Sequence, residues 1–551
     1  MNKLHKDLSN ALRFLSIDAV QKANSGHPGM PMGMADVATV LFKYHLRFNP
    51  NNPSWINRDR FILSAGHGSM LLYSLLYLTG YKNFSIKDIK NFRQLSSICA
   101  GHPEYKKNTG IETTTGPLGQ GLGNSIGLAI GEEIFRKRFG SSVINHKTYV
   151  IASDGDLMEG ISHEAMSLAG HLKLNNLIVF FDNNKISIDG STSLSVSDDY
   201  RKRFESYGWN YIDVNGHDHK QISNAIKKAS KSKKPNIISC KTIIGFGSPN
   251  KSGKASSHGS PLGHDEISLV RKKLKWNYSP FETPKDILNA WREIGTKGIV
   301  LERKWNSSLK KKSPKIKKEL EKTLKNQGLK NLDKLINDEK NKYFKEKPSK
   351  ATRECSMIII ESLSKLLPEL IGGSADLSGS NNTKTKNSKV ISSKNFDGNY
   401  IHYGIREHGM SAAMNGLALY GGLIPFGGTF LIFSDYCKPS IRLSAFMGLK
   451  VIYIFSHDSI GLGEDGPTHQ PIEQLAGLRA IPNLNVFRPA DINETIECWQ
   501  IALKNDNTPS AIALSRQKLP YINSSFSKDN RCKYGAYIVN DNSDDSTITL
   551  M

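Results

Sequence analysis

The feature that most constrains this chain is a pair of short apolar runs within residues 149–190, each followed by an oxygen-bearing side chain. YVIAS is followed by Asp154, and NLIVFFDN is followed by Asn184, thirty positions after Asp154. The segment ISHEAMSLAGHLKL between them has helical spacing, and a strand–helix–strand unit has about this length. Such a unit brings both polar ends to the carboxyl edge of one parallel sheet, where α/β proteins bind ligands.

Asp154 and Asn184 offer hard oxygen ligands, which suit a magnesium ion that also holds phosphate oxygens. The span resembles the diphosphate-binding motif of thiamine-diphosphate enzymes, written GDG…NN. Ser153 stands where that motif has its first glycine. A small residue there is a mild change unless the backbone requires a positive φ.

The composition predicts a globular, cytoplasmic protein of several domains. At 551 residues the chain is too long for one core, and its 38% hydrophobic and 23% charged residues are typical of globular proteins. Its six cysteines are scattered without a C-x-x-C pair, which favours reduced thiols in the cytosol. We find neither a leader peptide nor an apolar run of membrane-spanning length, so we expect no membrane partner.

A net charge of +23 raises the question of nucleic-acid binding. The densest basic run, residues 304–325, alternates lysines with glutamates and apolar residues at helical spacing, which indicates a solvated helix face. Because no basic motif with interleaved aromatic residues occurs, we expect no nucleic-acid partner. A positive potential would still attract phosphorylated substrates.

The order of helical and strand signals predicts an α/β fold class with parallel sheets. Residues 1–315 form a first α/β domain, residues 316–350 a Lys- and Glu-rich helical linker, and residues 351–522 a second α/β domain. In residues 523–551 the segments YGAYIVND and TITLM suggest strands. We therefore expect this last segment to begin a truncated third α/β domain.

Four glycine-rich loops of the first domain each carry a histidine, which suits proton transfer and the binding of hydroxyl or phosphate groups. A single histidine of this kind is most often structural, but four in one domain favour a shared site. The turn GPLGQG, which begins at Gly116 and leads into a helix, offers free N–H groups for a diphosphate. The four residues are His27, His67, His102 and His258.

The second domain adds a further set of candidate residues. Glu407 opens a helical run among small residues, which favours a packed site over a surface charge. Three aromatic residues follow at three-residue spacing, a pattern that fits a core-facing helix stripe as well as it fits a binding site. A final His/Asp/Arg set suits polyol and phosphate binding at strand ends. These residues are Phe430, Phe433 and Tyr436, then His457, Asp465, His469 and Arg516.

Taken together, the motifs resemble those of the transketolase family, in order and spacing, from Ser25 to Arg516. The blocks are SGHPGMPMG, GPLGQGLGN, DGDLMEGISHE, KTIIGFGSPN, GGSADLSGSN, HYGIREHGM and HDSIGLGEDGPTHQP. The resemblance makes residues 1–315 a diphosphate-binding domain and residues 351–522 a pyrimidine-binding domain, in a chain that lacks most of the C-terminal domain.

The resemblance also implies an activity of the pentose phosphate pathway. Thiamine diphosphate, through a carbanion intermediate, would move a two-carbon ketol unit from a ketose phosphate to an aldose phosphate. The family's active sites are shared between the subunits of a homodimer, with Glu159 and Glu164 expected near the interface. Each site combines the first domain of one subunit with the second domain of the other.

The resemblance assigns roles residue by residue. Catalysis would fall to Glu407, which would hydrogen-bond the aminopyrimidine ring, and to His27, His258 and His469. Magnesium, or calcium or manganese in its place, would be held by Asp154, Asn184 and the backbone carbonyl of Ile186. Cofactor contacts would come from His67, Gly116, Pro117, Leu118, Gly155, Asn184, His258, Phe430, Phe433 and Tyr436. The substrate would meet His27, His102, His258, Arg353, Ser380, His457, Asp465, His469 and Arg516.

Two alternatives stay open at this point. One is another thiamine-diphosphate transferase, such as a dihydroxyacetone synthase or a deoxyxylulose-phosphate synthase. The other is a catalytically inactive paralogue that acts as a binding protein. The presence of Asp154, Asn184 and Glu407 argues against the second.

Overall fold

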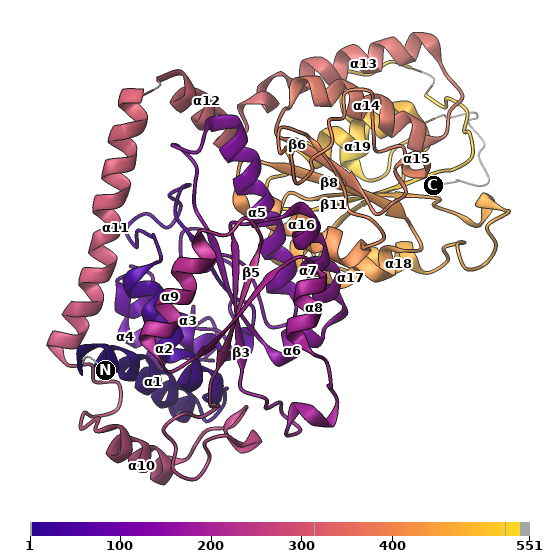
Figure 1. Ribbon diagram of the computed structural model, residues 1–551. Helices are drawn as coiled ribbons and strands as arrows, with labels where there is room; N and C mark the ends of the chain where they lie inside the picture. Colours follow the sequence, from indigo (N-terminus) through magenta and orange to yellow (C-terminus); the bar gives the residue numbers. More distant parts are fainter. Residues whose placement is uncertain (1–2, 313, 524, 540–551) are drawn as a thin grey trace. The chain divides into compact units, whose positions relative to one another are not determined.

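The computed structural model describes residues 3–312, 314–523 and 525–539, which form two compact units. Unit 1 is Met1–Lys317 and unit 2 is Lys318–Met551, and each is described by itself (Figure 1). Helices α12 (Pro314–Leu324) and α13 (Leu332–Glu346) occupy most of the Lys- and Glu-rich segment. No helix of the described residues is long and apolar enough to cross a membrane.

Unit 1 is built on a five-stranded parallel sheet of order β1-β2-β3-β5-β4. Helix α7 (Gly160–Leu172) connects β2 to β3, which confirms the strand–helix–strand unit predicted from the sequence. Ser153 at the end of β2 pairs in register with Asp182 of β3. The strands are β1 Arg60–Leu63, β2 Thr148–Ser153, β3 Leu177–Asn183, β4 Asn210–Asn215 and β5 Asn236–Lys241.

Helices cover both faces of this sheet, because nearly every residue of its three central strands is buried and most are apolar. Figure 1 shows α1, α2, α3 and α9 on one side and α5, α7 and α8 on the other. The helices are α1 Lys3–Ala23, α2 Gly29–Tyr44, α3 Ser69–Thr79, α4 Ile86–Lys90, α5 Gln120–Phe139, α6 Asp154–Met158, α8 Tyr200–Ser206, α9 His219–Ser230, α10 His264–Leu274 and α11 Lys285–Lys312.

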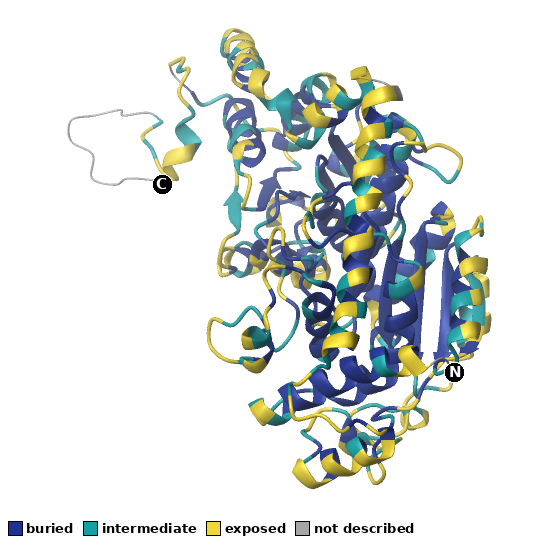
Figure 2. Cartoon of the chain, turned by 90° about the vertical axis from the view of Figure 1, so that its left-hand side faces the viewer, coloured by how far each residue is buried: buried dark blue, intermediate teal, exposed yellow. Residues whose placement is uncertain are grey.

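Unit 2 repeats the architecture with a six-stranded parallel sheet of order β10-β11-β9-β8-β6-β7. Helices α13, α14 and α19 pack over one apolar core with the sheet. Across the chain, Figure 2 shows buried strands and helices whose outer faces are exposed. The strands are β6 Leu370–Ser374, β7 Tyr400–His402, β8 Ile424–Phe430, β9 Ile452–Ser456, β10 Asn485–Phe487 and β11 Ser510–Leu514. The helices are α14 Thr352–Leu366, α15 Ser378–Asn381, α16 Glu407–Tyr420, α17 Ser434–Phe446, α18 Gln474–Arg479 and α19 Ile492–Lys504.

The segment after β11 packs against a buried ion pair between α13 and α19. Lys340 donates to Glu497 at 2.5 Å and to the backbone carbonyl of Asp529 at 2.8 Å. The other Glu497 oxygen accepts the backbone N–H groups of Arg531 and Cys532. Within residues 525–539 the structure has one short 3-10 helix and no strand. The predicted strand TITLM lies outside the described residues, so the truncated third domain stays a prediction.

Candidate functional site

Asp154 lies at the carboxyl edge of the unit 1 sheet, where it opens α6 directly after β2. It is only 3% exposed, and its Oδ2 atom has no hydrogen-bond partner among the described residues. Burial and the nearby charge of Asp182 raise the pKa of Asp154 to about 7, although the backbone N–H of Lys185 hydrogen-bonds to the carboxylate. A buried carboxylate oxygen without a partner is costly, and a bound cation would supply that partner.

The other predicted metal ligands lie on the loop that follows β3. The Oδ1 atom of Asn184 accepts the backbone N–H of Ile186 at 2.9 Å, and Lys185 between them has a φ of +60°. No cluster of three His, Cys, Asp or Glu side chains that could hold a metal occurs in the part of the chain that is described. A cation would therefore depend on one carboxylate, one amide and one backbone carbonyl, and these oxygen donors fit magnesium.

Ser153, the departure from the glycine of the motif, is accommodated without strain. Its φ is −102°, in the extended region, so no positive φ is required. Its hydroxyl caps α6 by accepting the N–H of Asp156, and the Asp156 carboxylate accepts the Ser153 N–H in return. Together they form a capping box, a pattern that stabilises a helix N-terminus.

Asp156, which sequence reasoning did not single out, ties the glycine-rich turn to this edge. Its Oδ1 atom accepts the Ser64 hydroxyl at 2.6 Å and the Gly119 backbone N–H at 2.9 Å. Gly119 has a φ of +78°, a conformation that favours glycine. A Cβ on Gly155 would lie 2.8 Å from a Leu118 methyl carbon, so the backbone after Asp154 passes close to the turn.

The remaining turn residues are equally close-packed. A Cβ on Gly66, the neighbour of His67, would lie 2.5 Å from the backbone nitrogen of Gly116, and Gly116 has a φ of +131°. Pro117 follows it, and α5 begins at Gln120. The N-terminus of this long helix suits a diphosphate.

The four histidines predicted to share a site do come together in unit 1. The ring centroid of His27 lies 5.4 Å from that of His67, 6.2 Å from His102 and 5.7 Å from His258. The pKa of His27 is lowered to about 4, chiefly by burial and then by its neighbours His258, Arg93 and His102. Burial likewise lowers the pKa values of the other three. Burial therefore favours the neutral form of all four rings.

In unit 2, Glu407 is the first residue of α16, as predicted, and it is half-buried. Burial raises the pKa of its carboxyl group. Its backbone carbonyl lies 3.5 Å from the Cys437 sulfur, within reach of a weak thiol hydrogen bond. A carboxyl group whose burial favours the neutral form can share a proton with a ligand.

The aromatic residues do not form a core-facing helix stripe, so that interpretation of their spacing is wrong. Phe430 ends β8, Phe433 precedes α17, and Tyr436 lies within α17 but is 63% exposed. The rings of Phe430 and Phe433 are nearly parallel, with centroids 5.8 Å apart. The histidine rings of His457 and His469 pack around them, with centroids 3.8 Å from Phe430 and 5.4 Å from Phe433 respectively. The group forms an aromatic wall at the carboxyl ends of β8 and β9.

The predicted substrate residues of unit 2 gather around His457. Burial, and then the charges of Arg353 and Arg516, lower the pKa of His457 to about 4, and Asp465 and His469 act on it as well. Arg353 donates to the Ser380 backbone carbonyl at 2.9 Å. Two arginines, two histidines and an aspartate thus converge, which suits a phosphorylated polyol.

Comparisons with known proteins identify the family of the chain. The family model described as transketolase, thiamine diphosphate binding domain, matches residues 4–328, and the one described as transketolase, pyrimidine binding domain, matches residues 348–521. The chain belongs to the transketolase family. It is 51% identical over 546 residues to the transketolase of Sinorhizobium medicae, covering 99% of this chain and 78% of that protein.

Solved transketolase structures have the same fold. That of Campylobacter jejuni superposes with a TM-score of 0.87 at 46% identity, covering 95% of this chain and 80% of the other. That of Pichia stipitis in complex with sedoheptulose-7-phosphate superposes with a TM-score of 0.91 at 42% identity, covering 98% and 81%. The chain is therefore a thiamine-diphosphate-dependent transferase of the transketolase type. Neither another transferase activity nor an inactive paralogue is favoured.

Proposed function

We propose that the edge of unit 1 holds thiamine diphosphate through magnesium and that the enzyme transfers a two-carbon ketol unit between sugar phosphates. The observation that carries this proposal is the buried, unpartnered oxygen of Asp154 beside Asn184, close to the glycine-rich turn. The direct test is a coupled assay with a ketose phosphate and an aldose phosphate, with and without thiamine diphosphate and magnesium. Turnover that is the same without added cofactor, in protein stripped of it, would contradict the proposal.

Unit 1 would bind the diphosphate end of the cofactor. Asp154, Asn184 and the Ile186 carbonyl would hold the cation, for which calcium or manganese could substitute. The turn Gly116, Pro117, Leu118 with Gly155, His67 and His258 would contact the cofactor. When bound, thiamine diphosphate supplies a nucleophilic carbon that also acts as an electron sink.

The chain's own residues would then move protons and exclude water. Glu407, whose pKa is raised by burial, would share a proton with a pyrimidine nitrogen. Phe433, with Phe430 and Tyr436, would stack on the pyrimidine ring. His27, His102 and His258 would accept or return protons of substrate hydroxyl groups, with His469 acting from the aromatic wall.

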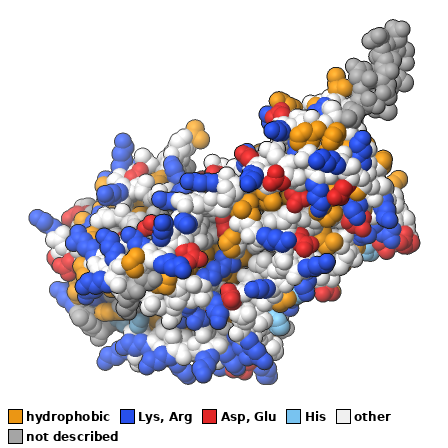
Figure 3. All heavy atoms as spheres, turned by 90° about the horizontal axis from the view of Figure 1, so that it is seen from above, with side chains coloured by type: hydrophobic (Ala, Val, Ile, Leu, Met, Phe, Trp, Pro, Cys, Tyr) orange, Lys and Arg blue, Asp and Glu red, His pale blue; other side chains and the backbone are white. Residues whose placement is uncertain are grey.

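Sugar phosphates are the substrates that the unit 2 cluster favours. The phosphosugar bound by the Pichia stipitis relative supports this class. Arg353, Ser380 and Arg516 would hold the phosphate end, and His457 and Asp465 the hydroxyl groups. Lys and Arg side chains are numerous among acidic ones on the face shown in Figure 3, and such a potential would attract anionic substrates rather than require a nucleic acid.

Replacing Arg516 by Ala should weaken phosphosugar binding more than chemistry. Arg516 forms an ion pair with Glu464, so its guanidinium is held in place but is not committed to a buried partner. We expect KM for a phosphosugar to rise about tenfold or more with a smaller change in kcat, because a lost charge-assisted contact is worth roughly 1.5–3 kcal/mol. Steady-state kinetics with a phosphorylated and an unphosphorylated acceptor would measure this. An equal loss for both acceptors would contradict a phosphate contact.

We also propose that the chain works as a homodimer in the cytoplasm, with each active site shared between subunits. Several large apolar side chains near the two half-sites are strongly exposed, which is typical of an interface. All six cysteines are free thiols, in keeping with a reducing compartment. The apolar side chains are Ile188, Leu194, Ile405, Ile460 and Ile472, with Glu159 exposed and Glu164 partly buried in the nearby α7 region.

A mixing experiment tests the shared site. Asp154→Asn subunits and Glu407→Ala subunits should each be nearly inactive alone. In a mixed dimer with shared sites, one site carries both changes and the other carries neither, so activity should return after the subunits exchange. Mixed wild-type and doubly substituted subunits serve as the control for exchange. No recovery despite proven exchange would place each site within one subunit.

A further inference from the structure

Asp182 is a buried carboxylate that the proposed cofactor and substrate contacts do not use. It lies near the end of β3, paired in register with Ser153 on one side and Cys240 on the other, and it is 0% exposed. No cationic side chain forms an ion pair with it among the described residues. A buried charge is costly unless it is well hydrogen-bonded. The hydrogen bonds that Asp182 accepts therefore indicate its role.

Both oxygens of Asp182 are used. The Thr242 hydroxyl donates a short hydrogen bond to Oδ1, and the amide nitrogen of Asn184 donates to Oδ2 at 2.9 Å. An ionised carboxylate only accepts hydrogen bonds, and an amide nitrogen only donates them. The contact therefore decides which end of the Asn184 amide points toward Asp182.

The orientation of that amide matters because magnesium binds oxygen. With its nitrogen held by Asp182, Asn184 leaves its carbonyl oxygen for other partners. That oxygen accepts one hydrogen bond, from the Ile186 N–H, and a carbonyl oxygen has a second lone pair. A flipped amide would present N–H groups to the cation instead.

We propose that Asp182 is the positioning residue of the cation site: anchored by Thr242, it holds the Asn184 amide with its oxygen available to the cation. This rests on the proposed function, in which Asn184 is a ligand. Residues that orient metal ligands without touching the metal typically change affinity by about 10–100-fold when they are replaced. The series Thr242–Asp182–Asn184 joins the end of β5 to the loop after β3.

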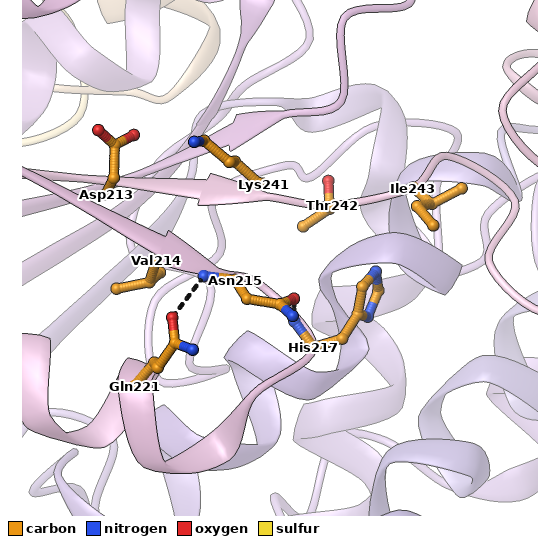
Figure 4. Close-up of a pocket in the computed structure, with 8 residues that line it drawn as sticks. All are labelled: Asp213, Val214, Asn215, His217, Gln221, Lys241, Thr242 and Ile243. Atoms are coloured by element: carbon orange, nitrogen blue, oxygen red, sulfur yellow. Dashed lines mark hydrogen bonds between the residues drawn. The ribbon is translucent and has the colours of Figure 1, made fainter.

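The same sheet edge provides a matched control. Thr242 lines a pocket of about 600 Å³ at the ends of β4 and β5, together with Lys241, His217 and Asp213 (Figure 4). Asp213 is exposed and forms an ion pair with Arg201 at 2.5 Å. It is a carboxylate near the end of β4, which β5 separates from β3, and it has no hydrogen bond to Asn184 among the described residues. Asp213→Asn should therefore leave the cation site unchanged.

The test is a titration of the full-length protein with manganese in the presence of thiamine diphosphate, followed by electron paramagnetic resonance. Asp182→Asn should weaken manganese binding about 10–100-fold, whereas Asp213→Asn should bind as the wild type does. The exchange variant Asp182→Asn/Asn184→Asp should recover most of the affinity. An aspartate at position 184 has oxygen at both ends and needs no orientation, and the exchange keeps the net charge.

The outcomes separate this inference from the function on which it rests. If the wild type itself fails to bind manganese, the proposed cation site is wrong. If the wild type binds and Asp182→Asn binds equally well, only the positioning role is overturned. If Asp182→Asn fails to fold by circular dichroism, the exchange variant decides, and a tenfold or greater loss in a folded exchange variant overturns the role.

Discussion

Glu407→Ala should lower turnover by about 10²-fold or more while leaving the cofactor bound. The expectation follows from a half-buried carboxyl group at the start of α16 whose pKa burial raises. Such a group can share a proton with a ring nitrogen of the cofactor, and alanine removes that partner. Cofactor affinity should change far less, because the diphosphate and cation contacts proposed for unit 1 remain.

Glu407→Gln is the matched variant, since it keeps the size and hydrogen-bonding capacity of the side chain but cannot exchange the proton. It should be nearly as inactive as Glu407→Ala. Calorimetric titration with thiamine diphosphate and magnesium would show whether each variant still binds the cofactor. Turnover close to that of the wild type in either variant would contradict the proton-sharing role.

The parts of the fold and site that follow local sequence patterns could be predicted. Buried parallel strands require continuous apolar runs, which made the strand–helix–strand unit around Asp154 visible. The same patterns predicted Glu407 at the start of a helix. The histidine cluster was predictable because each histidine lies in its own glycine-rich loop, and such loops meet at one edge of a parallel sheet.

The parts that depend on contacts between distant segments could not be predicted. The role of Asp156 becomes visible only in the structure. There Ser64 and Gly119, which are distant in the sequence, donate hydrogen bonds to its carboxylate. In the sequence, Asp182 is only a polar residue near the end of an apolar run. The structure shows that Thr242 and Asn184 donate hydrogen bonds to its two carboxylate oxygens. The only sequence signal for either was a carboxylate two positions from a predicted ligand.

The three aromatic residues could not be assigned for a different reason, because their local sequence pattern was ambiguous. Three-residue spacing is compatible with a helix, but Phe430 belongs to a strand and Phe433 to the turn that follows it. Spacing alone does not identify the element when a run crosses from strand to helix. The contacts with His457 and His469 resolve it.

Asp154→Asn should abolish tight cofactor binding and yet stabilise the protein when metal is absent. The change removes a cation ligand, and we expect a loss of cofactor affinity beyond the roughly 10–100-fold typical of residues that only support a ligand. In the metal-free protein the same carboxylate has a buried oxygen without a partner and lies near the charge of Asp182. A neutral amide avoids most of that cost while keeping an oxygen for the Lys185 N–H.

The variant should therefore be more stable than the wild type without metal and less stable than the wild type with metal and cofactor. A buried, unsatisfied polar group costs about 1–3 kcal/mol, and more when it is charged. At about 2–4 °C per kcal/mol for a domain of 150–250 residues, the Asn variant should melt several degrees higher than the wild type in chelator. Adding magnesium and thiamine diphosphate should reverse the order, because only the wild type gains stability from binding. Thermal melts of both proteins in the two conditions, with Asp213→Asn as the control, would measure this. If the variant melts lower than the wild type in chelator, or still gains stability from the cofactor, Asp154 is not the cation ligand that we infer from its buried, unpartnered oxygen.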